Sequence, residues 1–129
     1  PSRRAAQRSG LTQALGGKMD NGDRWESQRG DEWWFSSGGL SASAAFVPGS
    51  SALSIGNIAG LASARQLHVL LSRTVSQFPG VEPRLFVTSS IKSLLGELTA
   101  HHAITWAPLN HPFSVEACIK SVAPISAAT

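Results

Sequence analysis

The chain divides into two halves of different composition, and this division limits where a packed core can form. Residues 1–50 are rich in Gly, Ser, Arg and Asp, and no helical or strand period of apolar residues holds across them. Such a segment cannot bury enough apolar surface to offset the entropy of ordering its backbone. Residues 51–129 carry regular apolar patterns. We therefore predict a long, irregular, extended N-terminal arm over 1–50 and one folded domain over 51–129.

The predicted arm contains a dense aromatic cluster, which is costly to leave in water. Trp33, Trp34 and Phe35 are consecutive, and Trp25 precedes them. Large aromatic side chains carry much of the binding energy of protein interfaces. We expect the arm to lie on another protein, with Trp25, Trp33, Trp34 and Phe35 as its partner-binding anchors. The alternative is that these rings pack onto the chain's own domain.

The second half is predicted to contain strands and two amphipathic helices. Apolar residues at helical spacing, from Ala64 to Phe78, form a stripe that ends at Pro79-Gly80. Adjacent apolar residues at 84–88 are typical of a buried central strand. The expected elements are a strand at 51–57, a helix at 61–77, strands at 84–88, 94–101 and 103–109, and a helix at 112–122. The strand at 94–101 could instead begin as a short helical turn.

This order, β-α-β-β-β-α, predicts an α/β fold with a mixed four-stranded sheet. A strand, a helix and a strand of these lengths form a right-handed unit with parallel strands. The next two strands are close enough in sequence to form an antiparallel hairpin, and the last helix would cover the sheet. The predicted layout is thioredoxin-like.

Two blocks of the second half carry a resemblance to a known family. A loop with Gly60 and Ser63 leads to Arg65 at the start of the long helix, and the run 107–110 (Ala-Pro-Leu-Asn) precedes Ser114. Over about residues 52–122 the chain resembles the thioredoxin-like family shared by an accessory subunit of mitochondrial NADH:ubiquinone oxidoreductase (complex I) and some mitochondrial ribosomal proteins. The resemblance implies a structural subunit of the matrix arm, with no catalytic residue and no cofactor of its own.

The chain departs from this family at its cysteines. Complex I members typically carry one Cys in the first strand and another just after the second, where this chain has Ile55 and Ser89. A disulfide of the family type therefore cannot form. The segment before the expected hairpin turn also departs from the family's pattern, at 93–95 and Ala103.

The sequence contains no recognisable constellation for catalysis or metal binding. Cys118 is the single cysteine, so neither a thiol pair for redox exchange nor a cysteine-rich zinc site can form. We expect Cys118 to be a buried structural residue on the inner face of the last helix. His101 and His102 are adjacent and His111 follows, but the spacing supplies no evident third ligand. We predict a non-enzymatic chain without metal or cofactor.

Charge and hydropathy point to partners other than a membrane. There are 11 Lys+Arg against 8 Asp+Glu, a net charge of +3. No run of about 18 apolar residues occurs, so no transmembrane helix and no direct membrane insertion are expected. Arg3, Arg4, Arg8 and Lys18 precede the first acidic residue, as in the remnant of a mitochondrial transit peptide or an ordinary basic tail.

The expectation is therefore an accessory subunit held by other protein subunits, on the matrix side of the mitochondrial inner membrane. The alternative is a mitochondrial ribosomal protein of the same family that contacts RNA. In that case the phosphate-binding residues would be the basic start of the chain together with Arg65, Arg73, Arg84, Lys92 and Lys120.

Overall fold

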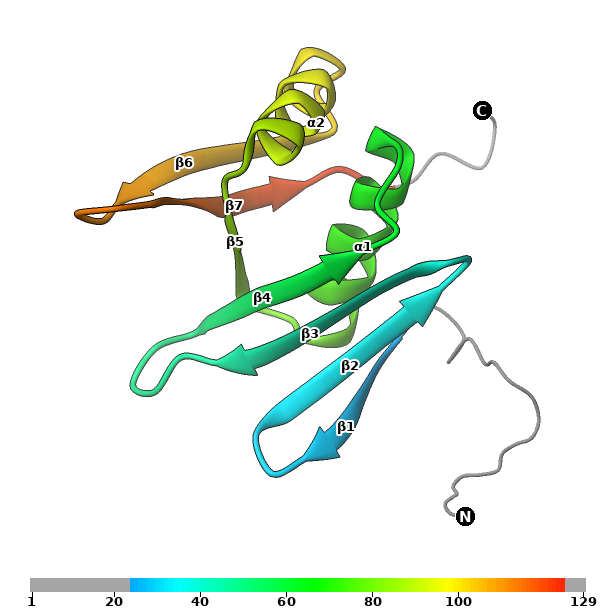
Figure 1. Ribbon diagram of the computed structural model, residues 1–129, viewed down its shortest axis with the longest axis vertical. Coiled ribbons are helices and arrows are strands. Elements are labelled where there is room, and N and C mark those ends of the chain that lie inside the picture. Colours follow the sequence, from blue (N-terminus) through cyan, green and yellow to red (C-terminus); the bar gives the residue numbers. More distant parts are fainter. Residues whose placement is uncertain (1–23, 125–129) are drawn as a thin grey trace.

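The computed structural model describes residues 24–124, which form a mixed α/β domain of one seven-stranded sheet and two helices (Figure 1). The elements are β1 (Trp25–Arg29), β2 (Glu32–Ser37), β3 (Leu40–Phe46), β4 (Ala52–Ala59), α1 (Ala64–Gln77), β5 (Glu82–Phe86), α2 (Ser89–Ala100), β6 (Ile104–Asn110) and β7 (Val115–Val122). The strand order is β1-β2-β3-β4-β5-β7-β6. Only β4 and β5 pair in parallel; every other neighbouring pair is antiparallel.

Both helices lie on the same face of the sheet. The connections β4-α1-β5 and β5-α2-β6 proceed in the same direction along the strand order. Right-handed crossovers in one direction place their helices on one side. Helix α1 packs against α2, β5 and β7, and α2 packs against β6 (Figure 1). Within residues 24–124 the sheet therefore has one covered face and one face on which no helix packs, here called the uncovered face.

The core lies between the covered face and the helices. Its largest fully buried side chains come from both ends of the described chain and include the rings of Trp25 and Phe35. The remaining fully buried residues of this group are Leu40, Leu53, Ile55, Leu67, Leu70, Leu71, Thr74, Pro83, Leu85 and Leu95. Apolar area removed from water is the main favourable term in folding, so these residues hold the sheet and helices together.

Residues 25–46 form three antiparallel strands, so the prediction of an irregular arm over 1–50 is wrong for these residues. The hairpin turns are the two-residue loops 30–31 and 38–39, and both glycines of the second loop have positive φ, as tight hairpins require. Strand β3 alternates buried and half-buried residues, but Ala and Ser make that alternation faint in the sequence. Residues 1–23 lie outside the described residues.

The predicted boundary between residues 50 and 51 falls inside the sheet. Strands β3 and β4 flank it and pair with each other, from Phe46 and Leu53 onward. The loop that follows β4 also contacts the β2–β3 turn, because a Cβ on Gly60 would lie 2.0 Å from the carbonyl oxygen of Gly39. Only glycine permits that approach, and Gly60 has a φ of 78°. The first three strands are therefore continuous with the rest of the domain.

The segment predicted as a strand at 94–101 is part of helix α2, so that prediction is wrong. The Thr88 side chain caps the helix by accepting a hydrogen bond from the Ile91 amide, at 3.2 Å. Ile91, Leu95 and Leu98 are buried and follow helical spacing. The mid-helix Gly96, which lowers helix propensity, obscured this pattern.

The segment predicted as a helix at 112–122 is strand β7, so that prediction is also wrong. Ala117 and Ile119 face the core, and Glu116, Cys118 and Lys120 alternate with them. Strand β7 pairs with both β5 and β6 and closes that side of the sheet. The sheet consequently has seven strands where four were predicted.

The α/β class and the other predicted elements of the second half are confirmed. Helix α1 ends at Gln77, as the Pro79-Gly80 stop indicates, and begins at a capping box in which the Ser63 hydroxyl accepts from the Gln66 amide. Strands β4, β5 and β6 lie where strands were predicted, within a few residues at each end.

Candidate functional site

Two of the four predicted anchors lie in the chain's own core. Trp25 and Phe35 are 1% and 0% exposed, and their ring centroids are 5.4 Å apart. The indole Nε1 of Trp25 donates to the Thr74 hydroxyl at 2.9 Å. The Gln77 side-chain amide accepts from the Trp25 amide at 2.6 Å and donates to the Trp25 carbonyl at 2.7 Å. These rings fix β1 and β2 onto α1, which is the packing that the alternative interpretation described.

Trp33 is half-buried at the rim of the same core. Its ring meets Phe78 edge-on, with centroids 5.1 Å apart, and Phe46 at 6.4 Å. Phe46 and Phe78 are themselves 5.3 Å apart. This three-ring cluster ties the ends of β2 and β3 to the end of α1, and edge-to-face contacts of this kind add stability beyond area burial.

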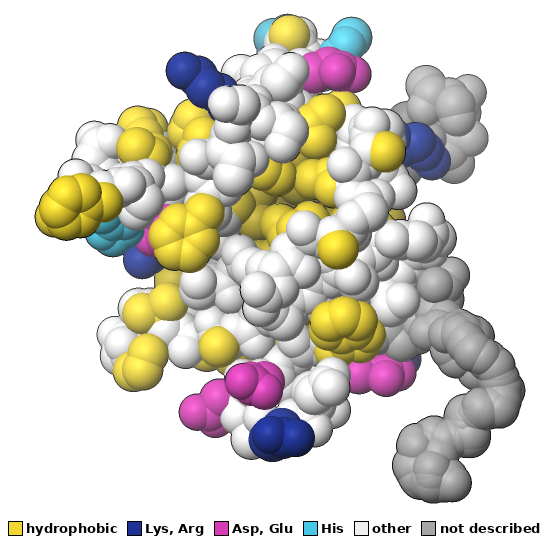
Figure 2. Space-filling model, in the orientation of Figure 1, with side chains coloured by type: hydrophobic (Ala, Val, Ile, Leu, Met, Phe, Trp, Pro, Cys, Tyr) yellow, Lys and Arg dark blue, Asp and Glu magenta, His cyan; other side chains and the backbone are white. Residues whose placement is uncertain are grey.

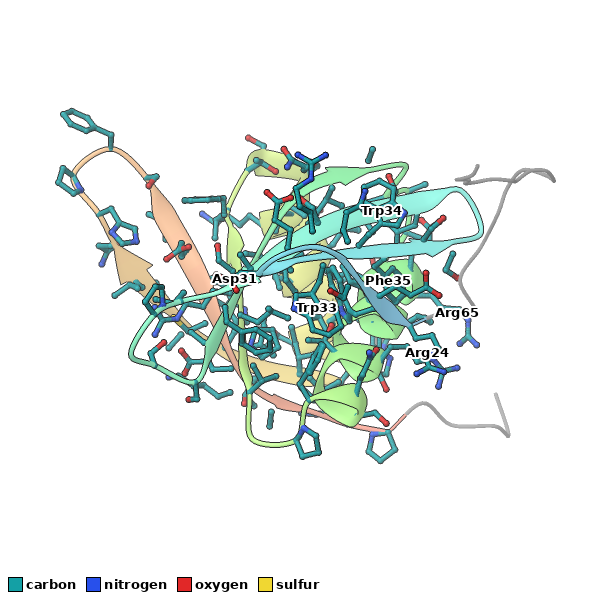
Figure 3. The ribbon with its side chains drawn as sticks, turned by 90° about the horizontal axis from the view of Figure 1, so that it is seen from below. Arg24, Asp31, Trp33, Trp34, Phe35 and Arg65 are labelled. Carbon is teal, nitrogen blue, oxygen red and sulfur yellow. The ribbon has the colours of Figure 1, made fainter. Side chains whose placement is uncertain are left out.

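Trp34 lies on the other side of β2, on the uncovered face. Figure 3 shows its side chain on the side of the strand away from Phe35 and α1. Its side chain is 37% exposed. Because neighbouring residues of a strand point to opposite faces, the consecutive aromatics divide between core and surface. Of the four predicted anchors, Trp34 has the largest exposed fraction.

A shallow hollow of about 420 Å³ lies beside Trp34. Its lining includes Ser43 and Ala45 of β3 and Ser54 and Gly56 of β4, with Glu32 at one side. Cross-strand pairing aligns Trp34 with Ser43 and Ser43 with Gly56, so one wall is aromatic and the floor is made of small residues. We call this hollow the Trp34 groove. Sequence reasoning missed it, although the Ser/Ala alternation of β3 was its visible signal.

A β-bulge shapes the end of the Trp34 groove. The β3–β4 register shifts between Ser41 and Ser43, and Asn57 adopts a φ of 51°. The Asn57 side-chain amide donates to the Ser43 hydroxyl at 2.9 Å. Asparagine is among the few residues that tolerate this backbone region. The bulge therefore shapes the floor of the groove near the end of β4.

An ion-pair group occupies the uncovered face on the far side of β4. Glu82 accepts from Lys120 Nζ at 2.7 Å and from Arg84 Nε at 2.9 Å. The hydrogen bond from Lys120, followed by that from Arg84, lowers the pKa of the Glu82 carboxyl. The same contacts with Glu82 raise the pKa of Arg84 and of Lys120. The two cations share one carboxylate, so the group keeps a net charge of +1.

Cys118 lies on strand β7, beneath this ion-pair group. The prediction that placed it on a last helix is wrong, because that segment is a strand. Cys118 is a free, buried cysteine, and its cross-strand neighbour is Arg84. Burial is the main cause that raises the pKa of the Cys118 thiol. A protonated, buried thiol is a poor nucleophile, and a second cysteine is absent from the sequence. The arrangement offers no thiol–disulfide exchange.

A second hollow, of about 440 Å³, lies at the carboxyl ends of the parallel strands β4 and β5. Figure 2 shows apolar side chains at its bottom, between the two helices and the sheet. Ligands of α/β sheets commonly bind at such ends. The lining is mainly apolar with two hydroxyls, and it contains no titratable side chain: Ile55, Gly56, Asn57, Ile58, Gly60, Leu61, Phe86, Thr88, Ser90 and Ile91. It could hold an apolar group but supplies no acid or base.

The structure does not bring the three predicted histidine candidates together. His101 and His102 end α2, whereas His111 follows β6, and the length of that strand separates them by roughly 20 Å. His111 Nε2 lies 3.0 Å from Glu116 Oε1. Within residues 24–124, no group of three or more His, Cys, Asp or Glu is placed to hold a metal ion.

The candidate RNA-binding cations are dispersed. Arg65 and Arg73 lie on α1 and Lys92 on α2, whereas Arg84 and Lys120 lie on the uncovered face with Glu82. A continuous phosphate-binding surface needs its cations on one side. None of the helices in the described part of the chain is long and apolar enough to span a bilayer. Comparison with protein-family models, with curated proteins and with solved structures finds no match to this chain.

Proposed function

We propose that the chain is a non-catalytic structural subunit that binds another protein through the uncovered face of its sheet, with Trp34 as the anchor. The observation that carries this proposal is the position of Trp34. A large aromatic side chain is 37% exposed beside a hollow of about 420 Å³, whose lining apart from Trp33 and Trp34 is small or polar. Accessible aromatics beside a recess are typical binding hot spots.

The assembly that we propose for this subunit is the matrix arm of mitochondrial complex I, with the mitochondrial ribosome as the alternative. Support comes from the sequence resemblance, whose blocks fall on the first turn of α1 at Arg65 and on β6 at 107–110. The parallel β4-α1-β5 unit agrees with the thioredoxin-like layout that the resemblance implies, whereas α2 and β7 stand where that layout was predicted to have a strand and the last helix. The scattered cations favour a protein partner over RNA.

The test is incorporation of the Trp34→Ala full chain into a large assembly. Mitochondria are solubilised in mild detergent and separated on a density gradient, and the chain is quantified by mass spectrometry. We expect at least a tenfold loss of co-migration with NADH dehydrogenase activity, because removing an interface hot spot costs about 2 kcal/mol or more. Phe113→Ala is the matched control, since Phe113 is fully exposed in the β6–β7 turn, away from the groove.

The two variants separate the possible outcomes. Unchanged incorporation of Trp34→Ala would remove Trp34 as an anchor. Co-migration of the wild-type chain with ribosomal RNA, with release by RNase, would replace complex I by the ribosomal alternative. A parallel thermal unfolding curve of each variant shows that any loss of incorporation does not come from unfolding.

A further inference from the structure

We propose that the partner segment on the uncovered face carries an acidic residue whose carboxylate binds Arg84 and Lys120, next to an apolar side chain that packs on Phe86. This inference rests on the proposed function and names the chemistry of the partner. It concerns the β5–β7 part of the uncovered face, which lies on the other side of β4 from Trp34.

Arg84 and Lys120 share a single carboxylate. Arg84 Nε donates to one oxygen of Glu82 at 2.9 Å, and Lys120 Nζ donates to the other at 2.7 Å. Among residues 24–124, Glu82 is the one carboxylate within ion-pair distance of either cation. A guanidinium has five N–H donors and an ammonium has three, so Glu82 uses only a fraction of them. The surplus of donors and the net charge of +1 favour an anionic ligand.

The two cations can be reached from the open side of the sheet. The side chain of Lys120 is 52% exposed and that of Arg84 is 25% exposed. Ser54 of β4 is the neighbour of Arg84 on one side, and Cys118 of β7 is its neighbour on the other. The next strand places Ala107 beside Cys118. Because these flanking side chains are small, a partner side chain can approach Arg84 without displacing a large residue.

Phe86 supplies an apolar surface next to the cations. It lies two residues beyond Arg84 on β5, on the same face and roughly 7 Å along the strand, and it is 51% exposed. Its cross-strand neighbour Glu116 is 8% exposed, and the Glu116 carboxylate lies 3.0 Å from His111 Nε2. A partner that covers this end of the face therefore meets the Phe86 ring more than the Glu116 carboxylate.

These features together favour an acidic residue beside an apolar one in the partner. Hydrogen bonds from a guanidinium or an ammonium to a carboxylate are charge-assisted, and covering the exposed ring removes apolar area from water. A nucleic-acid backbone carries many phosphates and needs a continuous track of cations. Arg65, Arg73 and Lys92 lie on the helices and not beside this group. The geometry therefore fits an acidic protein segment better than RNA.

The test uses the full chain and a short blocked peptide in which one glutamate stands between two leucines, with serines on either side. Binding is followed by NMR through the arginine Nε–H resonances, which single Arg→Lys variants assign. We expect the Arg84 resonance to shift and saturate, and the resonance of Arg65 on α1 to stay in place. Raising the salt concentration should weaken binding, because the charges are partly exposed. The same peptide with glutamine in place of glutamate should produce no shift.

Charge variants locate the binding groups, and the backbone amide shift of Phe86 gives the affinity of each. The double variant Arg84→Gln with Lys120→Gln should bind the peptide about fivefold more weakly. Glu82→Gln should bind it about twofold more tightly, because both cations lose their shared carboxylate. A merely structural role of the group would not produce effects of opposite sign. Lys92→Gln is the matched control, since Lys92 is an exposed lysine on α2 and should leave the affinity unchanged.

Equal affinities of the glutamate and glutamine peptides, or of the double variant and the wild type, would overturn the inference. A uridine oligonucleotide that shifts the Arg84 resonance and displaces the peptide would also overturn it, because the group would then bind phosphate. A peptide that fails to bind while Trp34→Ala still prevents incorporation would overturn the acidic-partner inference alone. Peptide binding together with unchanged incorporation of Trp34→Ala would remove the Trp34 anchor and leave the acidic-partner inference in place.

The same spectra test two competing occupants of the site. If Asp20→Asn with Asp23→Asn moves the Arg84 resonance without peptide, the chain's own N-terminal segment holds the site. If that resonance moves when the chain is diluted, a second copy of the chain holds it. Either result would overturn the assignment to a partner, and we expect neither.

Discussion

Trp25 and Trp34 belong to adjacent strands of one hairpin, yet they lie in different parts of the molecule. Trp25 is 1% exposed on the covered face, with its indole hydrogen-bonded to Thr74, whereas Trp34 is 37% exposed beside the groove of the uncovered face. The amino-acid type is the same, so hydrophobicity does not decide between core and surface here. Strand register does, because a shift of one residue exchanges the two faces.

The same contrast holds for the two faces as wholes. Large apolar side chains, such as Phe35, Leu53 and Leu85, meet the helices on the covered face. Small and charged side chains, such as Ser43, Ser54 and Glu82, occupy the uncovered face. We therefore expect substitutions on the covered face to affect folding and those around Trp34 to affect binding.

The largest expected effect is that of Trp25→Ala on stability. The substitution empties a fully buried site between β1 and α1, and we expect a loss of about 3–5 kcal/mol in the free energy of unfolding. Urea denaturation measures it, with Trp34→Ala as the control, for which a change within about 0.5 kcal/mol is expected. Equal and small losses for both variants would show that β1–β3 is not part of the cooperative core.

The sequence predictions succeeded for β4-α1-β5 and failed for β1–β3 because these two regions differ in residue content. The β4-α1-β5 unit was recognisable because Leu67 and Leu71 mark a helical stripe and Pro79-Gly80 ends it. Strands β1–β3 were not, because their core-facing residues include Ala42 and Ala44, which barely differ in hydrophobicity from the serines between them. The one clear local signal in this region is the Gly38-Gly39 turn, where both glycines have positive φ.

The candidate site was less predictable than the fold. Sequence reasoning identified Trp34, but it grouped all four aromatics as anchors because it lacked the register that sends Trp25 and Phe35 inward. Glu26 gave no signal, since its proximity to Trp34 exists only once β1 and β2 pair. In β7, the alternation of Ala117 and Ile119 with Glu116 and Lys120 was visible, but the apolar Cys118 favoured a helical interpretation.

A middle-sized effect is expected for Thr74→Val. The change keeps the shape of the side chain but leaves the buried indole N–H of Trp25 without its acceptor, at a cost of about 1–3 kcal/mol. Thr99→Val is the matched control on α2, because the Thr99 hydroxyl also donates to a carbonyl in its own helix but accepts from no indole. Urea denaturation of both variants gives the comparison, and equal losses would mean that the indole hydrogen bond contributes nothing.

The smallest effect is expected for the ion-pair group of the uncovered face. Hydrogen bonds from Lys120 and Arg84 lower the pKa of Glu82 in the folded chain. This contribution to stability is therefore present above the ordinary carboxyl pKa and is lost as pH falls through the lowered value. Glu82→Gln should reduce the drop in the urea midpoint between about pH 7 and about pH 3, and only slightly, since the pair is partly exposed.

Glu97→Gln is the control for this pH dependence. Glu97 is exposed on α2 and forms no ion pair within the described residues, so its replacement should leave the pH profile of the wild type unchanged. If the pH profile of Glu82→Gln coincides with those of the wild type and of Glu97→Gln, the ion-pair group around Glu82 contributes nothing to stability.

The most direct test of the division between the two faces is to measure stability and incorporation on the same Trp34→Ala protein. The account predicts an unchanged urea midpoint together with a loss of incorporation into the assembly of at least tenfold. A lowered midpoint with incorporation retained would contradict it, because Trp34 would then act as a core residue like Trp25 and the uncovered face would not be the binding face.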